Sequence, residues 1–541
     1  MGIDKSEWVV GKVLARHAAE RGERPFVQFQ DRAPVTYGEA HLIANRVGNA
    51  LLGHGVQPGE RVAVMLPNCL EYIWAWFGIN RIGAVHVGIN TAYKGSFLTH
   101  VLANAESRVG VFDRDYLPWL AEIEDTVPDM ELVFVPGPAL GPGEAPPFKR
   151  IKVMAFDALL AGPADEIDIE VSYRDIGVIM FTSGTTGPSK GVLMPHAHLY
   201  LFGQGQVEHL RLAEDDVYYI CMPLFHGGAM LMQLYGTLVA GARAVVVPMF
   251  SASHWLDDIR RHGCTITQLL GVMTDFLLRR PPTPHDKDHQ LKRMLAFPVT
   301  QEIVDQFRGR FGDITMLEAF GMTEINIVVW YPYDDPPQPG CSGKIWDEYF
   351  EVIIADPDTD EELARNDVGE VLVRPKQPYC FMQGYNAMPE RTVDTWRNFW
   401  FHTGDAARMD ERGYIWYVDR IKDTIRRRGE NISSYEVEVV LQDHPAVEEA
   451  AAVAIRDAVG REDEVLACIV LKPDKPAPTP AEMLDFCVPR MPYFAVPRYI
   501  EFMSELPKTP SHKLQKQKLR DRGLSPETWD REAAGYKVAR R

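Results

Sequence analysis

The chain has 541 residues and a formal net charge of −18, from 75 acidic and 57 basic residues. A nucleic-acid-binding protein needs a basic surface, so this charge disfavours a nucleic-acid partner. The charge leaves an anionic small ligand open, because a local cluster of donors can bind one on an acidic protein. At roughly 100–200 residues per domain, the length predicts three or four domains or subdomains.

The cysteines indicate the redox compartment. All seven are scattered along the chain and form no C-x-x-C pair. This spacing argues against structural zinc and a disulfide framework, so a reducing, cytoplasmic location is expected. The longest apolar stretch, Tyr218–Phe250, is interrupted by glycines, Pro223 and Arg243. It therefore predicts buried strands and a helix, and no stable membrane span.

Short apolar runs alternate with helical patterns in the first half of the chain. Glu39–His54 has apolar residues at helical spacing and leads into the apolar run Arg61–Leu66. Similar runs follow at Arg108–Phe112, Ile176–Phe181 and Ala242–Val247. Alternation of this kind predicts an α/β architecture.

The second half of the chain changes in pattern. Val368–Val373 and Tyr414–Val418 indicate a β-rich region. The elements expected further on are a helix at Ser434–Asp443, strands at Glu449–Ile455 and Val465–Lys472, and a helix at Thr479–Val488. These elements make a small α+β domain of about 120 residues. We therefore expect a large N-terminal domain over 1–419, with α/β sheets and a β-rich subdomain, and a small mobile domain over 420–541.

One loop is rich in glycine and hydroxyl groups. Phe181–Val192 reads FTSGTTGPSKGV and follows an apolar run. Its glycines let backbone N–H groups converge on an anion, and Lys190 adds a mobile positive charge suited to phosphate. It is not a Walker loop, because Pro188 and Ser189 separate Gly187 from Lys190. The loop predicts polyphosphate binding, with a plain surface turn as the alternative.

This loop resembles the phosphate loop of the adenylate-forming superfamily, which includes acyl-CoA synthetases, firefly luciferase and nonribosomal adenylation domains. Further motifs of the superfamily recur in the same order at Phe320–Glu324 (FGMTE), Phe401–Asp405 (FHTGD), Asp419–Ile425 with Arg428–Ile432, and Leu506–Lys513 (LPKTPSHK). The resemblance spans nearly the whole chain. Asp394–Asp405 and Met491–Arg498 look most like crotonobetaine/carnitine-CoA ligases and fatty-acid-type CoA ligases.

The resemblance implies two half-reactions, with ATP, Mg²⁺ and CoA taking part. A carboxylic acid reacts with ATP to give an acyl-adenylate and pyrophosphate, and the CoA thiol then takes the acyl group. The superfamily's nucleotide- and cofactor-binding positions correspond to Thr182, Ser183, Gly184, Thr185, Thr186, Gly187, Lys190, Phe320, Gly321, Asp405, Arg420 and Gly429. In this set the loop would hold the β- and γ-phosphates, and Asp405 would hydrogen-bond the ribose. Arg420 would support the nucleotide from the hinge, and the loop around Gly429 would line the pantetheine tunnel.

The resemblance also implies catalytic roles. Lys513 would bridge the carboxylate and the α-phosphate, Glu324 would ligate Mg²⁺, and Thr323 would contact the α-phosphate. His226 would gate the acyl pocket and the thiol tunnel, and Lys422 would be the hinge of domain alternation. Taken alone, each of these residues would be an ordinary structural or solvated side chain.

The acid itself is the least determined part of the prediction. Phe225–Leu234 and Ile325–Trp330 are expected to line an acyl pocket, which favours an apolar acid. We expect an ATP-dependent carboxylate-CoA ligase of fatty-acid-type metabolism, and leave a homodimer open. One alternative is an acyl-AMP ligase that loads a separate carrier protein. Another is a non-catalytic nucleotide-binding relative, against which intact Glu324, Asp405 and Lys513 argue.

Overall fold

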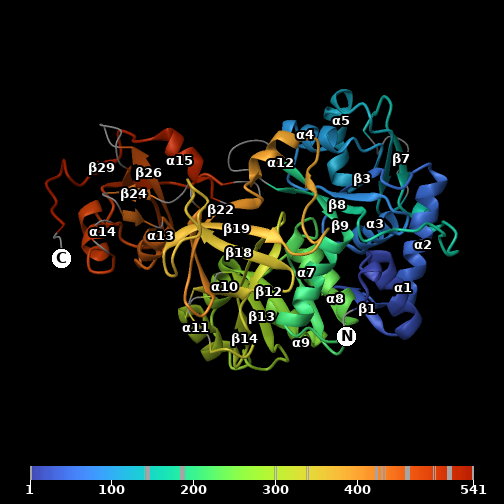
Figure 1. The fold of residues 1–541 in the computed structure, drawn as a ribbon, viewed down its shortest axis with the longest axis horizontal. Coiled ribbons are helices and arrows are strands. Elements are labelled where there is room, and N and C mark those ends of the chain that lie inside the picture. The colour runs from blue at the N-terminus through green and yellow to red at the C-terminus, as the bar shows by residue number, and fades with distance from the viewer. Residues whose placement is uncertain are drawn as a thin grey trace.

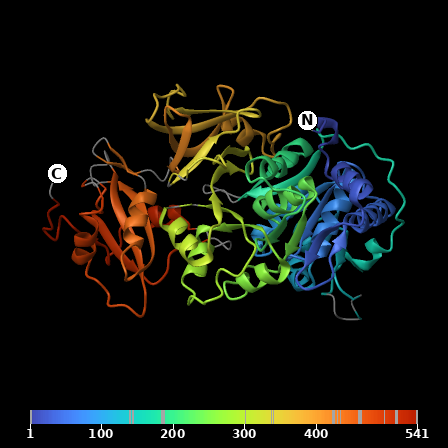
Figure 2. The ribbon, with the colours of Figure 1, turned by 90° about the horizontal axis from the view of Figure 1, so that it is seen from below.

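The computed structural model describes residues 3–138, 141, 146–182, 189–297, 299, 301–336, 338, 340–420, 425–427, 430–432, 434–456, 463–491, 493, 495–508 and 514–538. Three sheets form the large N-terminal part, and a four-stranded sheet with a separate two-stranded hairpin forms the C-terminal part. In Figures 1 and 2 the C-terminal elements, in orange and red, lie together at one end of the molecule.

Sheet I is parallel except at one edge. Its strand order is β20 (Gly384–Tyr385), β9 (Lys190–Pro195), β8 (Ile176–Thr182), β4 (Val85–Gly88), β3 (Arg61–Met65), β5 (Val109–Phe112), β6 (Leu132–Val135) and β7 (Lys152–Ala155). The strands β9 and β20 run antiparallel to their neighbours. Three of the expected apolar runs, Arg61–Leu66, Arg108–Phe112 and Ile176–Phe181, are therefore confirmed as strands of this sheet, and the fourth, Ala242–Val247, forms a strand of sheet II.

Sheet II is parallel apart from the β1–β2 pair. Its order is β14 (Thr315–Leu317), β13 (Arg293–Phe297), β12 (Ile266–Leu270), β10 (Val217–Ile220), β11 (Arg243–Val246), β1 (Pro25–Phe29) and β2 (Val35–Thr36). Because the strands are parallel, the carboxyl ends of β10, β12, β13 and β14 lie at one edge of the sheet.

Helices separate the two sheets and cover their outer faces. Val62 and Val64 of β3 face the core between the sheets, whereas Ala63 and Met65 face the outer core. The helices of the inner layer are α1 (Val10–Arg21), α2 (Tyr37–Gly53), α3 (Leu70–Arg81), α7 (His196–His209), the π-helix η4 (Gly228–Tyr235) and α8 (Gly236–Ala240). The outer helices are α4 (Ser96–Ala105) and α5 (Leu117–Glu122) on sheet I, and α9 (Trp255–His262), α10 (Gly271–Leu278) and α11 (Gln301–Phe311) on sheet II. Both faces of each sheet are buried, which explains the continuous apolar runs.

Local signals place the helices. Thr36 and Glu39 form a capping box that begins α2, with the Glu39 N–H donating to the Thr36 hydroxyl at 3.2 Å. The stretch Tyr218–Phe250 contains β10, η4, α8 and β11, so the expected strands and helix are confirmed. The π-helical form of η4 was not predicted. None of the helices in the described ranges has the length and apolar character that a bilayer crossing requires.

Sheet III is antiparallel and follows sheet II in the chain. Its order is β15 (Ala319–Met322), β16 (Asn326–Trp330), β17 (Cys341–Ile345), β23 (Tyr414–Arg420), β22 (Trp400–Met409), β19 (Val368–Pro375) and β18 (Phe350–Ala355), with β21 (Trp396–Arg397) beside β22. The short helices α6 (Asp157–Leu160) and α12 (Pro389–Thr395) lie in connections. The predicted β-rich region is thereby confirmed.

The C-terminal part has its own two-sided core. Its main sheet, sheet IV, is β26 (Val447–Arg456), β27 (Asp463–Leu471), β28 (Tyr499–Met503) and β29 (Trp529–Asp530), and a hairpin of β24 (Ile425–Arg427) and β25 (Glu430–Ile432) precedes it. Helices α13 (Ser434–Gln442) and α14 (Pro480–Cys487) pack on one face, and α15 (Lys516–Arg522) packs on the other. The predicted helices and strands of this small α+β part are confirmed.

Candidate active site

The predicted phosphate loop connects β8 to β9. Strand β8 ends at Thr182 and β9 begins at Lys190, and the two residues are paired across the ladder. His100 of α4 bonds through Nε2 to the Ser189 carbonyl oxygen at 2.8 Å, which ties the end of the loop to α4. The predicted residues Ser183, Gly184, Thr185, Thr186 and Gly187 lie outside the described residues.

Glu324 joins the ends of this loop to sheet III. It lies in the turn between β15 and β16 and is 4% exposed. Its Oε1 accepts hydrogen bonds from the Tyr385 hydroxyl at 3.0 Å and from the Thr182 hydroxyl at 3.4 Å. Lys190 Nζ donates to the Tyr385 oxygen at 3.3 Å and lies 4.5 Å from the centroid of its ring. The structure thus brings Thr182, Lys190 and Glu324 together around Tyr385, and we call these four residues the Glu324 cluster.

Sequence reasoning missed Tyr385. It lies 61 residues beyond Glu324 and reaches the site because β20 pairs with β9. No local pattern marks a tyrosine on a two-residue edge strand, so this contact needed the tertiary structure.

Thr323 is held by a histidine that sequence reasoning also missed. Burial lowers the pKa of His198 to about 4, so the ring is neutral and carries one N–H. Asn326 Nδ2 lies 3.2 Å from His198 Nδ1 and can donate to it. His198 Nδ1 also lies 3.2 Å from the Cys380 carbonyl oxygen, and Nε2 lies 2.9 Å from the Thr323 carbonyl oxygen, to which it can donate. This bond fixes the turn that presents Glu324.

Phe320 and Gly321 lie on β15, where the motif predicted nucleotide binding. The Phe320 ring is 6.1 Å from the half-exposed Tyr417 ring on β23, with 30° between the ring planes. A Cβ at Gly321 would lie 2.2 Å from the Asn326 carbonyl oxygen, so the bulge in the β15–β16 hairpin requires glycine. The two rings place an aromatic surface beside the Glu324 turn.

Glu318, the residue directly after β14, has a carboxyl group with a raised pKa. Burial raises the pKa of Glu318 to about 7, although the Val299 N–H and the Ser342 hydroxyl donate to it at 2.9 and 3.3 Å. Glu318 comes two residues before Phe320. Its charge therefore changes close to neutral pH at the edge of the candidate site.

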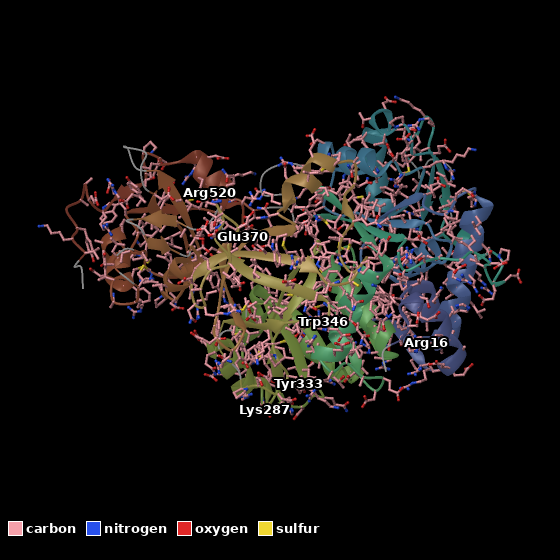
Figure 3. All side chains as sticks on the ribbon, in the orientation of Figure 1. Arg16, Lys287, Tyr333, Trp346, Glu370 and Arg520 are labelled. Carbon is pink, nitrogen blue, oxygen red and sulfur yellow. The ribbon has the colours of Figure 1, made fainter. Side chains whose placement is uncertain are left out.

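Asp405 lies on β22 and is 2% exposed. Its N–H donates to the Thr403 hydroxyl at 3.0 Å, and it pairs across the sheet with Arg420 of β23, of which the backbone is described. Gly404 has φ +69, a value that favours glycine, and its N–H donates to the buried Glu370 carboxylate at 2.9 Å. Figure 3 labels Glu370 on β19 of sheet III. Glu370 thus supports the irregular stretch of β22 just before Asp405, where the pairing with β19 shifts register, and sequence reasoning did not identify it.

His226 follows β10 and precedes η4. Its ring is half-buried and lies 4.6 Å, centroid to centroid, from the Phe225 ring. Asn68 holds the segment before it, because its amide donates to the Met222 carbonyl oxygen at 2.9 Å and its Oδ1 accepts the Leu224 N–H at 2.8 Å. The predicted gate residue is therefore on a segment clamped to the sheet.

The predicted acyl-pocket stretches occupy different places. Met230 of η4 is fully buried, with its sulfur 3.9 Å from the Tyr72 hydroxyl. Trp330 of β16 stacks on His209 of α7 at 5.1 Å, and a Cβ at Gly205 would lie 2.5 Å from its ring. Trp330 therefore packs against α7 in the core.

The C-terminal predictions cannot be placed in the same way. Lys422, Gly429 and Lys513 lie outside the described residues. They enter below as proposals.

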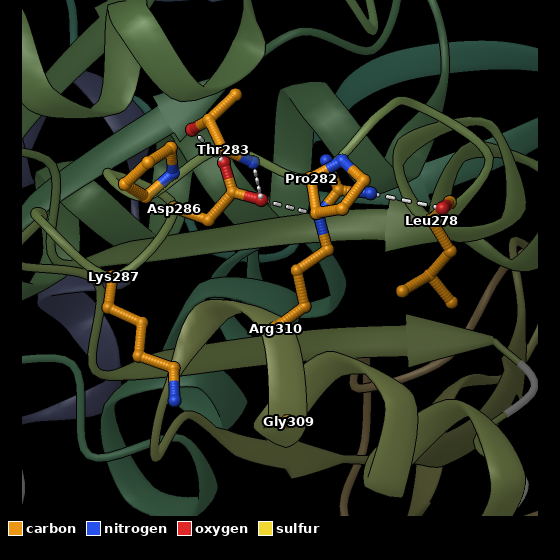
Figure 4. Close-up of a pocket in the computed structure, with 8 residues that line it drawn as sticks. Leu278, Pro282, Thr283, Asp286, Lys287, Gly309 and Arg310 are labelled. Carbon is orange, nitrogen blue, oxygen red and sulfur yellow. Dashed lines mark hydrogen bonds and ion pairs between the residues drawn. The ribbon is translucent and has the colours of Figure 1, made fainter.

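A cavity of about 460 Å³ lies between α10 and α11, apart from the motif residues. Arg310 donates there to Asp286 at 2.7 Å and to the Leu278 carbonyl oxygen at 3.0 Å (Figure 4). None of the predicted site residues lines this cavity. Its charged groups tie the two helices together.

The donor set of the Glu324 cluster fits a magnesium ion. Magnesium prefers carboxylate oxygens and usually keeps water and substrate phosphates as its other ligands. Within the described part of the chain, no group of three His, Cys, Asp or Glu side chains could hold a metal ion. One buried carboxylate oriented by two hydroxyls suits an ion that arrives with a nucleotide.

Comparison with known proteins agrees with these motifs and this geometry. A model of the AMP-binding enzyme family matches residues 14–386. The chain belongs to the AMP-binding enzyme family. The model of the AMP-binding enzyme C-terminal domain matches residues 436–513. The predicted resemblance to adenylate-forming enzymes is thereby confirmed.

Relatives of this AMP-binding enzyme include CoA ligases. It is 31% identical over 491 residues to the crotonobetaine/carnitine–CoA ligase of Salmonella typhi. The matched region is 90% of this chain and 93% of that ligase. The anthranilate CoA ligase in complex with anthranoyl-AMP superposes with a TM-score of 0.83 at 27% identity, over 95% of this chain and 97% of that one. The o-succinylbenzoate CoA synthetase of Bacillus subtilis, in complex with ATP and magnesium, superposes with a TM-score of 0.77 at 25% identity, over 94% and 99%. The predicted fold class is confirmed by these structures.

Proposed function

We propose that the Glu324 cluster binds the ATP and magnesium used by this enzyme, an AMP-forming acid–CoA ligase. In the first half-reaction a carboxylate oxygen attacks the α-phosphorus of ATP, and pyrophosphate leaves to give an acyl-adenylate. In the second, the CoA thiol loses its proton, its sulfur attacks the acyl carbonyl, and AMP leaves. The observation that carries the proposal is the meeting of one carboxylate, one ammonium and two hydroxyls at the ends of the phosphate loop.

The residues of the cluster divide the work of binding ATP. Thr182 and Lys190, with the loop 183–187 between them, hold the β- and γ-phosphates, because hydroxyl and ammonium donors make strong charge-assisted bonds to phosphate. Glu324 ligates magnesium, which neutralises phosphate charge when bound. Thr323 contacts the α-phosphate, and the His198 bond to its carbonyl oxygen keeps it in place.

Other described residues hold the rest of the nucleotide and the acyl group. Asp405 accepts hydrogen bonds from the ribose hydroxyls, and the Phe320 face packs on adenine next to Gly321. His226 separates the acyl pocket from the path of the thiol. Their position supports these roles. The parallel strands β10 and β14 both end at the carboxyl edge of sheet II, where β10 leads into His226 and β14 leads into Phe320.

The C-terminal domain supplies different residues to the two half-reactions. We place the boundary between 419 and 420, since the two family models match 14–386 and 436–513 on either side of it. Lys513 bridges the carboxylate and the α-phosphate in the first half-reaction. Rotation at Lys422 then brings the loop with Gly429 to the pantetheine of CoA, while Arg420 holds the nucleotide. One mobile domain thereby serves both steps.

The remaining proposals concern substrate and setting. The acid is a small carboxylic acid with a mainly apolar acyl group, supported by the buried Met230 and Phe225 beside His226. A cytoplasmic location is supported by the seven cysteines without paired spacing. A homodimer remains a prediction, which sedimentation of the purified protein tests.

The function is tested with purified protein, ATP, Mg²⁺, CoA and a panel of carboxylic acids. AMP and acyl-CoA should form together, and acyl-AMP without transfer to CoA would contradict CoA as the acceptor. Glu324→Gln should lose most of this activity. Glu124→Gln is a matched control: Glu124 is 3% exposed and accepts three backbone N–H groups, including that of Ile151 at 2.9 Å, outside the site.

The role of Lys513 is tested separately. Lys513→Ala should abolish ATP–pyrophosphate exchange but still convert supplied acyl-AMP and CoA to acyl-CoA. Lys508→Ala is the control, because the Lys508 ammonium in the same C-terminal segment is paired with Glu449 at 2.6 Å. Unchanged exchange in Lys513→Ala would show that this lysine has another role.

A further inference from the structure

Gln268 of β12 is a buried amide at the edge of sheet II where the site lies. It is 3% exposed, and among the described residues its side-chain oxygen Oε1 has no hydrogen-bond partner. Buried side-chain polar atoms in folded proteins nearly always have a partner, so each exception needs an explanation. A group that binds a ligand is one such explanation.

The side chain points toward η4. Successive residues of a strand face opposite sides of its sheet. Ile266 belongs to the core between sheets I and II, whereas Leu269 belongs to the outer core under α9 and α11. Gln268 therefore shares the inner face with Ile266. A Cβ at Gly228 would lie 3.2 Å from Gln268 Nε2, which places the amide against the first residue of η4.

This position lies between two segments of the site. Strand β12 has β10 on one side and β13 on the other. The carboxyl end of β10 leads to His226, and β13 ends at Phe297. Ligands of doubly wound sheets bind at the carboxyl ends of the strands, and Gln268 is two residues from the end of β12.

Apolar side chains lie close to this amide. The Met222 methyl group lies 3.1 Å from the same Cβ position at Gly228, and Met230 and Phe225 are buried in the same core. The π-helical form of η4 is a rare geometry that occurs frequently at functional sites. Binding pockets commonly combine apolar walls with a few placed polar groups.

We propose that Gln268 is a specificity-determining residue of the acyl pocket, and that the acid carries one uncharged hydrogen-bonding group on an otherwise apolar acyl chain. A hydroxyl, keto or amide group suits the Gln268 amide, which offers both a donor and an acceptor. A charged group does not suit it, because Met222 and Gly228 provide no opposite charge. The inference rests on the proposed acyl pocket beside His226.

The test compares matched acids. Wild-type enzyme is assayed by CoA-dependent AMP release with a straight-chain acid and with its hydroxy and keto derivatives, the substituent being moved along the chain. At the best position the polar acid should have a kcat/KM roughly 10- to 100-fold above that of the plain acid, because a plain acid leaves the buried amide unpaired. Gln268→Met, which is similar in volume but apolar, should abolish this preference.

Thermal unfolding separates recognition from structure. Gln268→Met and Gln268→Leu should keep or raise Tm, since they replace a buried amide whose oxygen has no partner among the described residues. Gln206→Met is the matched control: Gln206 is fully buried in α7, but its Oε1 accepts the Tyr218 hydroxyl at 3.2 Å. That variant should lower Tm and leave the acid preference unchanged.

Each outcome decides the inference. A polar preference that is lost in Gln268→Met and retained in Gln206→Met supports it. No preference at any substituent position, a preference that survives Gln268→Met, or a marked fall in Tm of both Gln268 variants overturns it. If wild-type enzyme activates no acid at all, the proposed function fails instead, which is a distinct result.

Discussion

Replacing Tyr385 with phenylalanine removes one oxygen atom from the centre of the Glu324 cluster. That oxygen donates to Glu324 Oε1 at 3.0 Å and accepts from Lys190 Nζ at 3.3 Å. A hydrogen bond to a charged group contributes about 1.5–3 kcal/mol, and each 1.36 kcal/mol changes a rate about tenfold. We therefore expect kcat/KM for ATP–pyrophosphate exchange to fall by about 10- to 150-fold.

The magnesium dependence gives a second measurement. Groups that orient a metal-binding carboxylate typically change metal affinity by about 10- to 100-fold when they are removed. The magnesium concentration for half-maximal exchange should therefore rise in Tyr385→Phe. Titration at saturating ATP and acid measures it directly.

The matched control is Tyr219→Phe. Tyr219 is 1% exposed and donates to Asp258 Oδ2 at 3.1 Å, on the side of sheet II covered by α9. This substitution removes the same kind of bond outside the site, so it should lower stability without changing exchange. If Tyr385→Phe stayed within twofold of wild type, or if Tyr219→Phe lost as much activity, the assigned role of Tyr385 would be wrong.

Three further predictions concern stability. Burial raises the pKa of Glu318 from 4.5 to about 7, so ionisation favours the unfolded chain and the free energy of unfolding falls as the pH rises through this range. In wild type the free energy of unfolding should fall by up to about 1.4 kcal/mol per pH unit, and in Glu318→Gln this fall should be absent. Chemical denaturation at pH 5 and pH 8 measures the difference. Burial lowers the pKa of His198 from 6.5 to about 4, so its contribution is lost as the pH falls through that window. When the pH drops from 7 to 4.5, the Tm of His198→Gln should fall less than the Tm of wild type. Thermal melts at the two pH values measure both falls. Gly205→Ala places a Cβ 2.5 Å from the Trp330 ring and should destabilise by about 1–3 kcal/mol, whereas Gly309→Ala in α11 meets nothing within 4 Å and should stabilise by about 0.5–1 kcal/mol.

Each of these has a result that contradicts it. Equal pH profiles for wild type and Glu318→Gln would show that this carboxyl ionises alike in the folded and unfolded chain. A larger acid-induced loss in His198→Gln would mean that the ring is charged in the folded protein. Similar stabilities for Gly205→Ala and Gly309→Ala would show that the Trp330 ring can move aside.

The order of the elements and the nucleotide-binding motifs were predictable because they are local. An apolar run such as Arg61–Leu66 is buried on both faces of β3, and a residue's neighbours in sequence are enough to show this. The loop before Lys190, the FGMTE turn with Glu324, and the FHTGD segment with Asp405 are each contiguous in sequence. Their order along the chain determined the family before any contact was known.

The contacts between these motifs depended on the tertiary structure. Tyr385 reaches Glu324 because a short strand pairs with β9, and His198 reaches Thr323 across 125 residues of sequence. Neither has a sequence pattern of its own, since a buried tyrosine or histidine is common in any core.

The amide of Gln268 shows the same division most clearly. In sequence it is a polar residue within an apolar strand, which predicts nothing about a ligand. Only the packing of sheet II against η4 shows that the amide is buried beside Gly228 and that its oxygen has no partner among the described residues. The sequence by itself determined the fold, the family and the nucleotide-binding motifs, because short-range patterns encode them. The tertiary structure decided which side chains support those motifs and which polar group is buried against η4, because burial and hydrogen bonding are set by residues far apart in the chain.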